Sequence, residues 1–304
     1  MLAETLEHWR TPAPKWVKAM GYVREQVALE YRHRRCAKTW APHLEQTRDL
    51  IRTAISQCAV KHHCVVLGAG HVLDIPLDDL AAAFERVELV DMAHPRAVRR
   101  KTGEYGNVHL IDADISGAAL ALYHFGQPDD PANTTFPKLP GLTKVCQVIG
   151  ANTPGATSLP QPAPDPSLIE GADLVISANI LSQLPLLLVE RLEKYAAWTD
   201  AAARKSFARA VIDHHLALLQ NHTGQVCLVT EVLRLVHDEE KPLEKIDPLF
   251  GAAIMFEGEE WWWDIAPRPE LSPDFDVRLR VLGIADLANA PQARYCRNTT
   301  LAAP

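Results

Sequence analysis

Long apolar runs are missing from this 304-residue sequence, and none reaches the roughly 18 residues that a membrane span needs. We therefore expect no membrane partner. The first residues carry acids and lack the basic-then-apolar order of a secretory signal, so we expect a cytoplasmic protein. The six cysteines show no regular spacing, which indicates reduced and mostly buried thiols. A phosphate-binding loop with its lysine and a nucleophile elbow are both absent.

An excess of basic residues is also missing. The formal net charge of −7 disfavours nucleic acid as the main partner, because phosphate binding needs a concentrated positive face. The densest positive cluster, residues 32–38, keeps that partner open. The cluster is either a solvated helix face or a set of side chains that meets an anionic substrate or lies over a ligand cleft.

The composition, 47% hydrophobic and 23% charged, is that of an ordinary globular protein. Its length allows one large α/β domain with an appendage, or two smaller domains. Apolar residues recur at helical spacing between about 16 and 57, with Pro42 as the one internal proline, which predicts two or three helices. We expect a helical cap over residues 1–60 and an α/β domain over residues 61–304.

A glycine turn opens the α/β domain. The apolar run that begins at Cys64 ends at Gly68 and Gly70, and a second apolar run ends at Asp91. Asp91 follows Gly68 by 23 positions, close to the roughly 20 expected between a glycine loop and an acid that binds a ribose hydroxyl. The pattern predicts the first half of a nucleotide-binding βαβ unit.

Strands and helices continue to alternate along the chain. We expect strands over 107–115, 172–181 and 225–232, helices over 74–84, 186–197 and 200–222 with Asp200 as cap, and a charged helical stretch after residue 232. Segments 260–265 and 275–282 predict an antiparallel hairpin. Repeated prolines indicate an insertion over about 123–170, with one short strand at 144–149.

This order of elements, with one glycine turn and a closing hairpin, resembles the class I S-adenosylmethionine-dependent methyltransferase family over roughly residues 64–282. The resemblance implies an α/β fold: a Rossmann-like, mostly parallel seven-stranded sheet with a C-terminal antiparallel hairpin, plus the N-terminal helical block. It implies S-adenosylmethionine as cofactor and a methyl acceptor, which we expect to be a small molecule. The alternative is a catalytically inactive, methyltransferase-like binding or interaction protein. Oligomeric state stays open.

The resemblance also implies roles for individual residues. Gly68, Ala69 and Gly70 match the loop under the methionine part of the cofactor, and Asp91 matches the acid that binds the ribose hydroxyls. The other implied cofactor residues are Met92 against the adenine, Asp114 and Ile115 at its amino group, and Ser177 and Asn179 in the segment that flanks the sulfonium.

Two positions depart from the family pattern. Val66 stands where the family usually has an acid, and Val72 stands where it has the third glycine. Asp74, at the start of the next helix, is a candidate to replace the missing acid. Without such a replacement the site would bind the cofactor weakly or not at all, which is the basis of the inactive alternative.

No catalytic residue can be assigned from the sequence. His71, His109 and Asp112 are candidate bases, although for each histidine a surface or structural role is the ordinary one. Cys58, His62, His63 and Cys64 are zinc-ligand types at the wrong spacing, so we expect no metal site. On a strand, Trp261 and Trp263 would face one way and Trp262 the other, as a stacking platform or as packing.

Overall fold

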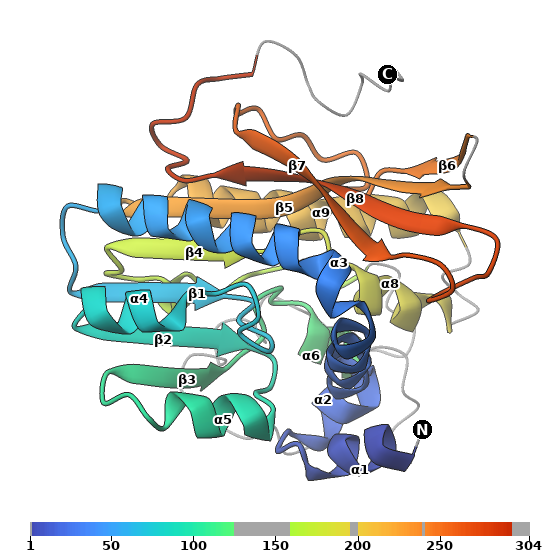
Figure 1. Cartoon of the computed structure of the whole chain (residues 1–304), viewed down its shortest axis with the longest axis horizontal. Helices are drawn as coiled ribbons and strands as arrows, with labels where there is room; N and C mark the ends of the chain where they lie inside the picture. Colours follow the sequence, from blue (N-terminus) through green and yellow to red (C-terminus); the bar gives the residue numbers. More distant parts are fainter. Residues whose placement is uncertain (1, 125–158, 195–199, 239–240, 294–304) are drawn as a thin grey trace.

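The computed structural model describes residues 2–124, 159–194, 200–238 and 241–293 (Figure 1). Its centre is one eight-stranded sheet in which seven strands follow the order β3-β2-β1-β4-β5-β8-β7. Strands β1 to β5 pair in parallel, and β8 is antiparallel to both β5 and β7. These strands are β1 His63–Leu67, β2 Arg86–Asp91, β3 Val108–Asp112, β4 Leu174–Ala178, β5 Gln225–His237, β7 Glu259–Ala266 and β8 Asp276–Ile284.

The predicted Rossmann-like fold and its C-terminal antiparallel hairpin are confirmed. The predicted charged helical stretch after residue 232 is wrong. Strand β5 continues for 13 residues to His237, and the Asp238 carboxylate accepts a 2.8 Å hydrogen bond from the Lys241 backbone N–H. The segment β6 Pro242–Ile246 pairs antiparallel with β5 as the eighth strand. Residues 242–246 form a strand because their backbone groups pair with those of β5. The spacing of apolar residues within the segment gives no information about this pairing.

Helices cover both faces of the sheet (Figure 1). One face packs against the C-terminal half of α3 (Tyr22–Gln57), α4 (Leu77–Ala83) and α5 (Arg96–Thr102). The other face packs against α6 (Ala119–His124), α8 (Leu186–Glu193) and α9 (Ala201–Gln220). Strand β4, buried along its whole length, is apolar apart from one serine because both of its faces lie under helices. Asp200 caps α9 as predicted, accepting from the backbone N–H groups of Ala202 and Ala203.

Three helices precede the sheet: α1 Leu2–Arg10, α2 Lys15–Met20 and α3. Two of them, α2 and α3, occupy the segment of about 16–57 for which the sequence predicts two or three helices, and α1 lies before it. Helix α3 has 36 residues, contains Pro42 and departs from helical geometry at Cys36, with φ −105° and ψ 18°. This kink separates two roles of α3. Its C-terminal half runs across the sheet, while its N-terminal half lies beyond the carboxyl ends of the parallel strands (Figure 1).

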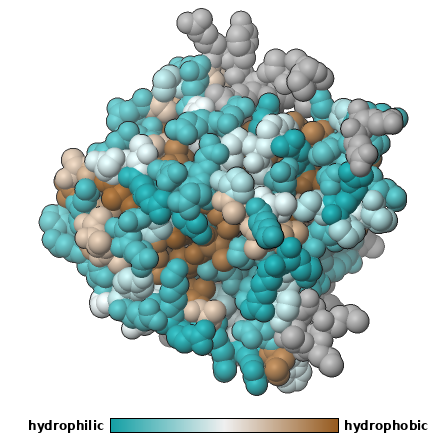
Figure 2. All heavy atoms as spheres, in the orientation of Figure 1, coloured by the Kyte–Doolittle hydropathy of each residue, from teal (hydrophilic) through white to brown (hydrophobic). Residues whose placement is uncertain are grey.

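Most of the proline-rich insertion, including the predicted strand at 144–149, lies outside the described residues. Its described end forms a short 3-10 turn, η2 Pro166–Leu168, capped by Asp165. Within the described ranges no helix has the length and apolarity to cross a membrane. On the face drawn in Figure 2, hydrophilic residues predominate and hydrophobic ones gather near the centre.

Candidate functional site

A cavity of about 570 Å³ lies at the carboxyl ends of the parallel strands. Its walls come from the N-terminal half of α3, the glycine turn after β1, the ends of β2 to β5, the segment after β6, and the β7–β8 hairpin. In open parallel sheets this edge, where the strand order reverses between β1 and β4, is the usual ligand site. Helix α3 thus forms a wall of the cavity as well as a layer of the fold.

The glycine turn keeps a left-handed backbone at three alternate positions. Gly68, Gly70 and Val72 have φ values of 80°, 49° and 56°. A Cβ atom at Gly68 would lie 2.5 Å from the Cβ of Ile180, so the loop after β4 packs directly on this turn. Val72 takes the left-handed conformation that a glycine would adopt freely, at a cost for a β-branched residue. Val72 therefore holds a backbone conformation that is typical of glycine.

Asp91 connects the glycine turn to the N-terminal helix. Its carboxylate accepts hydrogen bonds from the backbone N–H groups of Gly70 and Met92, both at 2.7 Å, and from Nε2 of Gln26 at 3.0 Å. Burial raises the pKa of Asp91, while the Gly70 N–H opposes that shift. Gln26 belongs to α3, and its backbone carbonyl oxygen lies 2.8 Å from Nε2 of His71. The cap helix and the glycine turn are therefore joined at the acid.

Most of the residues implied by the resemblance surround this cavity. Its lining includes Gly68, Ala69, Gly70, Asp91, Met92, Asp114, Ile115 and Asn179. Ser177 does not line it. The Ser177 hydroxyl lies 3.0 Å from Nε2 of His215, and both side chains are fully buried between β4 and α9. The alternation of a strand directs Ser177 to the α9 face and Ala178 to the opposite one.

Asp114 has a structural task in addition to its place in the lining. Its Oδ1 accepts from the backbone N–H and the hydroxyl of Ser116, and its Oδ2 accepts from the Ala119 N–H at 2.8 Å. These bonds cap α6. Tyr22, which the sequence did not identify, lies at the same end of the cavity. Burial raises the Tyr22 pKa well above its usual value, and the carboxylates of Asp114 and Asp91 raise it further.

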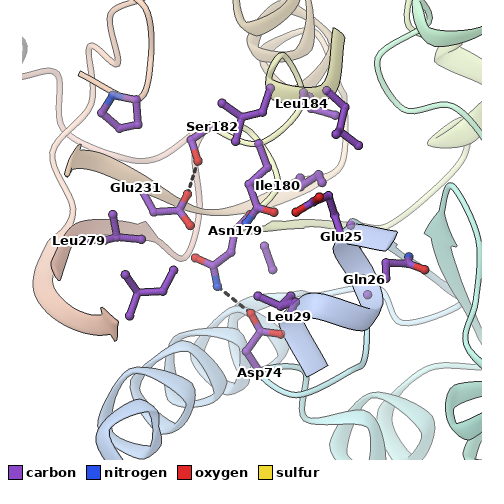
Figure 3. A pocket seen from close by; sticks show the side chains of 18 of the residues that line it. Glu25, Gln26, Leu29, Asp74, Asn179, Ile180, Ser182, Leu184, Glu231 and Leu279 are labelled. Atoms are coloured by element: carbon purple, nitrogen blue, oxygen red, sulfur yellow. Dashed lines mark hydrogen bonds between the residues drawn. The ribbon is translucent and has the colours of Figure 1, made fainter. Parts of the chain in front are cut away.

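A buried polar network lies at the other end of the cavity (Figure 3). Nδ2 of Asn179 donates to Asp74 at 2.6 Å, and the Ser182 hydroxyl donates to Glu231. Burial raises the pKa of both acids. Asp74 was a candidate from the sequence, whereas Glu231 was not. An acid inside the apolar run of β5 was the available sign, since carboxylates are rarely buried without a partner.

Aromatic rings form a wall between α3 and β7. The His43 ring stacks on Trp263 at 4.1 Å, and Nδ1 of His43 accepts from the indole N–H of Trp261 at 3.0 Å. Trp40 meets the Trp263 ring edge-on at 4.9 Å. Trp261 and Trp263 are buried, while Trp262 is 38% exposed beneath Arg278, as the predicted alternation requires. The cavity is also lined by Trp40, His43 and Trp263. These rings therefore pack α3 against β7 and at the same time form part of the cavity wall.

His43 is not a suitable proton acceptor. Burial lowers its pKa to about 3, so the ring is neutral, and the one lone pair that a neutral ring offers is used by Trp261 at Nδ1. The Asp112 carboxylate lies outside the cavity lining, 2.6 Å from Nδ1 of His94, and accepts a 2.9 Å hydrogen bond from the Arg99 guanidinium. His109 is exposed on β3. Of the three bases considered from the sequence, His71 alone lines the cavity.

The basic cluster at 32–38 is partly a solvated helix face and partly a wall of the cavity, so each of the two interpretations from the sequence holds for some of its residues. Arg32 lines the cavity, and Glu270 of the β7–β8 connection pairs with Arg32 at 3.5 Å and Arg35 at 2.6 Å. Arg34 pairs instead with Glu30 on the same helix. The cluster therefore ties the hairpin to α3 beside the cavity. Among the described residues, no group of three acid, cysteine or histidine side chains could hold a metal.

Comparison with known proteins gives loose structural likenesses. No family model matches, and no curated protein matches. The N-methyltransferase NodS from Bradyrhizobium japonicum, in complex with S-adenosylhomocysteine, is 14% identical, with 78% of this chain and 85% of that chain covered and a TM-score of 0.31. A 1,6-didemethyltoxoflavin-N1-methyltransferase from Burkholderia thailandensis is 11% identical, with 86% of this chain and 90% of that chain covered and a TM-score of 0.30. The 23S rRNA methyltransferase ErmE is 10% identical, with 79% of this chain and 70% of that chain covered and a TM-score of 0.28. Since these superpositions are loose, we infer function from the residues of this chain.

Proposed function

We propose that this protein is an S-adenosylmethionine-dependent methyltransferase. The observation that carries the proposal is Asp91: an acid at the carboxyl end of β2, bonded to the Gly70 N–H of the glycine turn and facing a 570 Å³ cavity. A carboxylate in this position is suited to the two hydroxyls of a ribose. The left-handed turn at Gly68 and Gly70 brings backbone close to a ligand without a side chain in the way.

The residues present also fit the rest of the cofactor. Met92 and Ile115 offer an apolar surface to the adenine. Asp74 supplies the acid that Val66 does not, and it is positioned by Asn179 to hold the ammonium of the methionine part. When bound, the cofactor supplies a methyl group on a sulfonium, which is a good leaving group. The protein then mainly has to hold the acceptor in line and exclude water.

The inactive alternative predicts that the substituted turn no longer accepts a ligand. We do not favour it, because Val72 adopts φ 56°, a backbone conformation that is typical of glycine. Asp74 likewise offers a second acid beside the cavity.

Calorimetry with S-adenosylmethionine, S-adenosylhomocysteine and NAD tests the proposal. We expect submillimolar binding of both sulfur ligands and none of NAD. Asp91→Ala should weaken binding by more than about tenfold, because a hydrogen bond to a charged group contributes about 1.5 to 3 kcal/mol. Asp112→Asn is the matched control, an acid at the end of the neighbouring strand that is engaged by His94 and Arg99. Failure of both sulfur ligands to bind the wild type would refute the function.

A further inference from the structure

Glu231 is a carboxyl group in an unusual position. It lies in β5, is only 3% exposed, and lines the cavity. Its oxygen accepts from the Ser182 hydroxyl, and the β5–β8 register shifts between Glu231 and Leu233. A bulge of this kind redirects side chains and is common beside functional sites. Figure 3 shows the carboxylate turned toward Ser182 and Asn179 at the end of the cavity away from Gln26.

The neutral side chains of Ser182 and Gln183 hydrogen-bond to the Glu231 carboxylate, and a second carboxylate, Asp74, acts on it. Burial is the main cause that raises the Glu231 pKa, and the Asp74 carboxylate adds to it. Among the described residues, Glu231 forms no ion pair with a cationic side chain, while the positive charge of Arg48 lowers the pKa of Asp74. Oδ1 of Asn179, between the two acids in Figure 3, is buried in this lining without a hydrogen-bond partner. Buried acceptors of this kind are costly unless a ligand supplies donors or positive charge.

The two acids belong to different elements and have different hydrogen-bond donors, Asn179 for Asp74 and Ser182 for Glu231, so we assign them to two different positive ligands. In the function proposed above, Asp74 and Asn179 hold the ammonium of the cofactor at the glycine turn. Glu231 extends from a different strand and is fixed by Ser182, on the far side of Asn179 (Figure 3). It is therefore available to a second cation, which in a methyltransferase is the acceptor.

Apolar and aromatic side chains also line this cavity. They include the Trp40 and Trp263 rings and, from α3 and β8, Leu29 and Leu279, and Figure 3 shows Leu279 next to Glu231. Such a wall favours an apolar or aromatic body attached to the charged group.

We propose that the methyl acceptor is an amine with an apolar or aromatic body, and that Glu231 binds its ammonium and accepts its proton; this inference rests on the proposed function. The ammonium R–NH3+ transfers one proton to the Glu231 carboxylate. The free amine then attacks the methyl carbon: the N–C bond forms while the C–S bond breaks, and its electron pair stays on sulfur. The products are R–NH2–CH3+ and the thioether, and the proton on Glu231 passes to solvent.

A matched set of probes tests the inference by binding. The full-length protein is saturated with S-adenosylhomocysteine, and 2-phenylethylamine, 2-phenylethanol and 3-phenylpropanoate are titrated by calorimetry. We expect the amine to bind at least about tenfold more tightly than the alcohol or the acid, because only the amine forms a hydrogen bond between two charged groups with Glu231. Glu231→Gln should remove this preference and leave S-adenosylhomocysteine affinity within about twofold. Glu244→Gln, an exposed acid on β6, should change neither affinity.

Each result decides between the two proposals. S-adenosylhomocysteine binding without an amine preference, including binding of none of the three probes, would overturn the amine acceptor and leave the methyltransferase. An amine preference that survives Glu231→Gln would overturn the role of Glu231. Absence of S-adenosylhomocysteine binding to the wild type would instead overturn the methyltransferase itself. Near-ultraviolet circular dichroism of Glu231→Gln establishes that the variant keeps its tertiary structure.

Discussion

Asn179 donates a 2.6 Å hydrogen bond from its side-chain amide to the carboxylate of Asp74, although the two residues are 105 positions apart in the chain. Asn179 adopts a left-handed φ of 51° directly after β4, a conformation that asparagine tolerates better than most residues. This bond joins the loop after β4 to the glycine loop after β1. The bond holds the Asp74 carboxylate beside the glycine turn. The family that the sequence resembles usually has its acid at the position of Val66 instead.

Asp74→Asn should weaken binding of S-adenosylhomocysteine about tenfold, because it removes the charge that faces the ammonium. The same substitution should leave 5′-methylthioadenosine within about twofold, because that ligand lacks the amino-acid part. Calorimetry with both ligands measures the difference. Asp79→Asn, an exposed acid of α4 paired with Arg52, is the control. An equal loss for both ligands would mean that Asp74 acts on the fold and not on the ammonium.

Gly68→Ala should destabilise the fold more than Gly171→Ala. Both glycines have positive φ, 80° and 70°, but an added Cβ at Gly171 meets nothing within 4 Å, whereas at Gly68 it meets Ile180. The left-handed conformation costs roughly 1 to 2 kcal/mol in each, and the clash adds about 1 to 3 kcal/mol at Gly68. Urea unfolding measures both. Adding Ile180→Ala should recover part of the Gly68→Ala loss, and strict additivity of the two substitutions would contradict the packing described.

Trp261→Phe should lower the free energy of unfolding by about 1 to 3 kcal/mol, because it leaves the buried Nδ1 of His43 without its donor. Trp262→Phe is the matched control on the exposed side of the same strand, with an expected change within about 0.5 kcal/mol. Guanidinium unfolding followed by circular dichroism compares them. Equal losses would show that the indole N–H contributes nothing beyond ring packing.

Glu231→Gln should change how stability depends on pH. The folded pKa of Glu231 is raised by burial, so above pH 4.5, its ordinary value, the folded state binds more protons at this site than the unfolded state. Wild-type stability contributed by this group is therefore full below pH 4.5 and is lost as pH rises through the folded pKa. Glutamine resembles the neutral acid, so the variant should gain stability relative to wild type from pH 4.5 upward. Thermal unfolding across pH, with Glu244→Gln as control, measures this gain, and a flat difference would contradict it.

Much of the fold was predictable from local sequence. Apolar runs that end in Gly68 or Asp91 indicated parallel strands, and the paired aromatic and β-branched segments indicated the closing hairpin. These features follow from side-chain periodicity, which acts within a few residues. The strand after His237 was missed because its structure depends on the length of β5 and not on its own five residues.

The sequence by itself determined the glycine turn, the acid at Asp91 and the opposite orientation of Trp262 relative to Trp261 and Trp263. Only the tertiary structure decided which of those residues share a cavity. It directed Ser177 to His215, joined Gln26 of the cap helix to Asp91, and turned Glu231 toward Ser182. The reason is physical: such contacts connect distant elements, and their geometry is set by helix kinks, strand bulges and close packing, none of which a short-range pattern records.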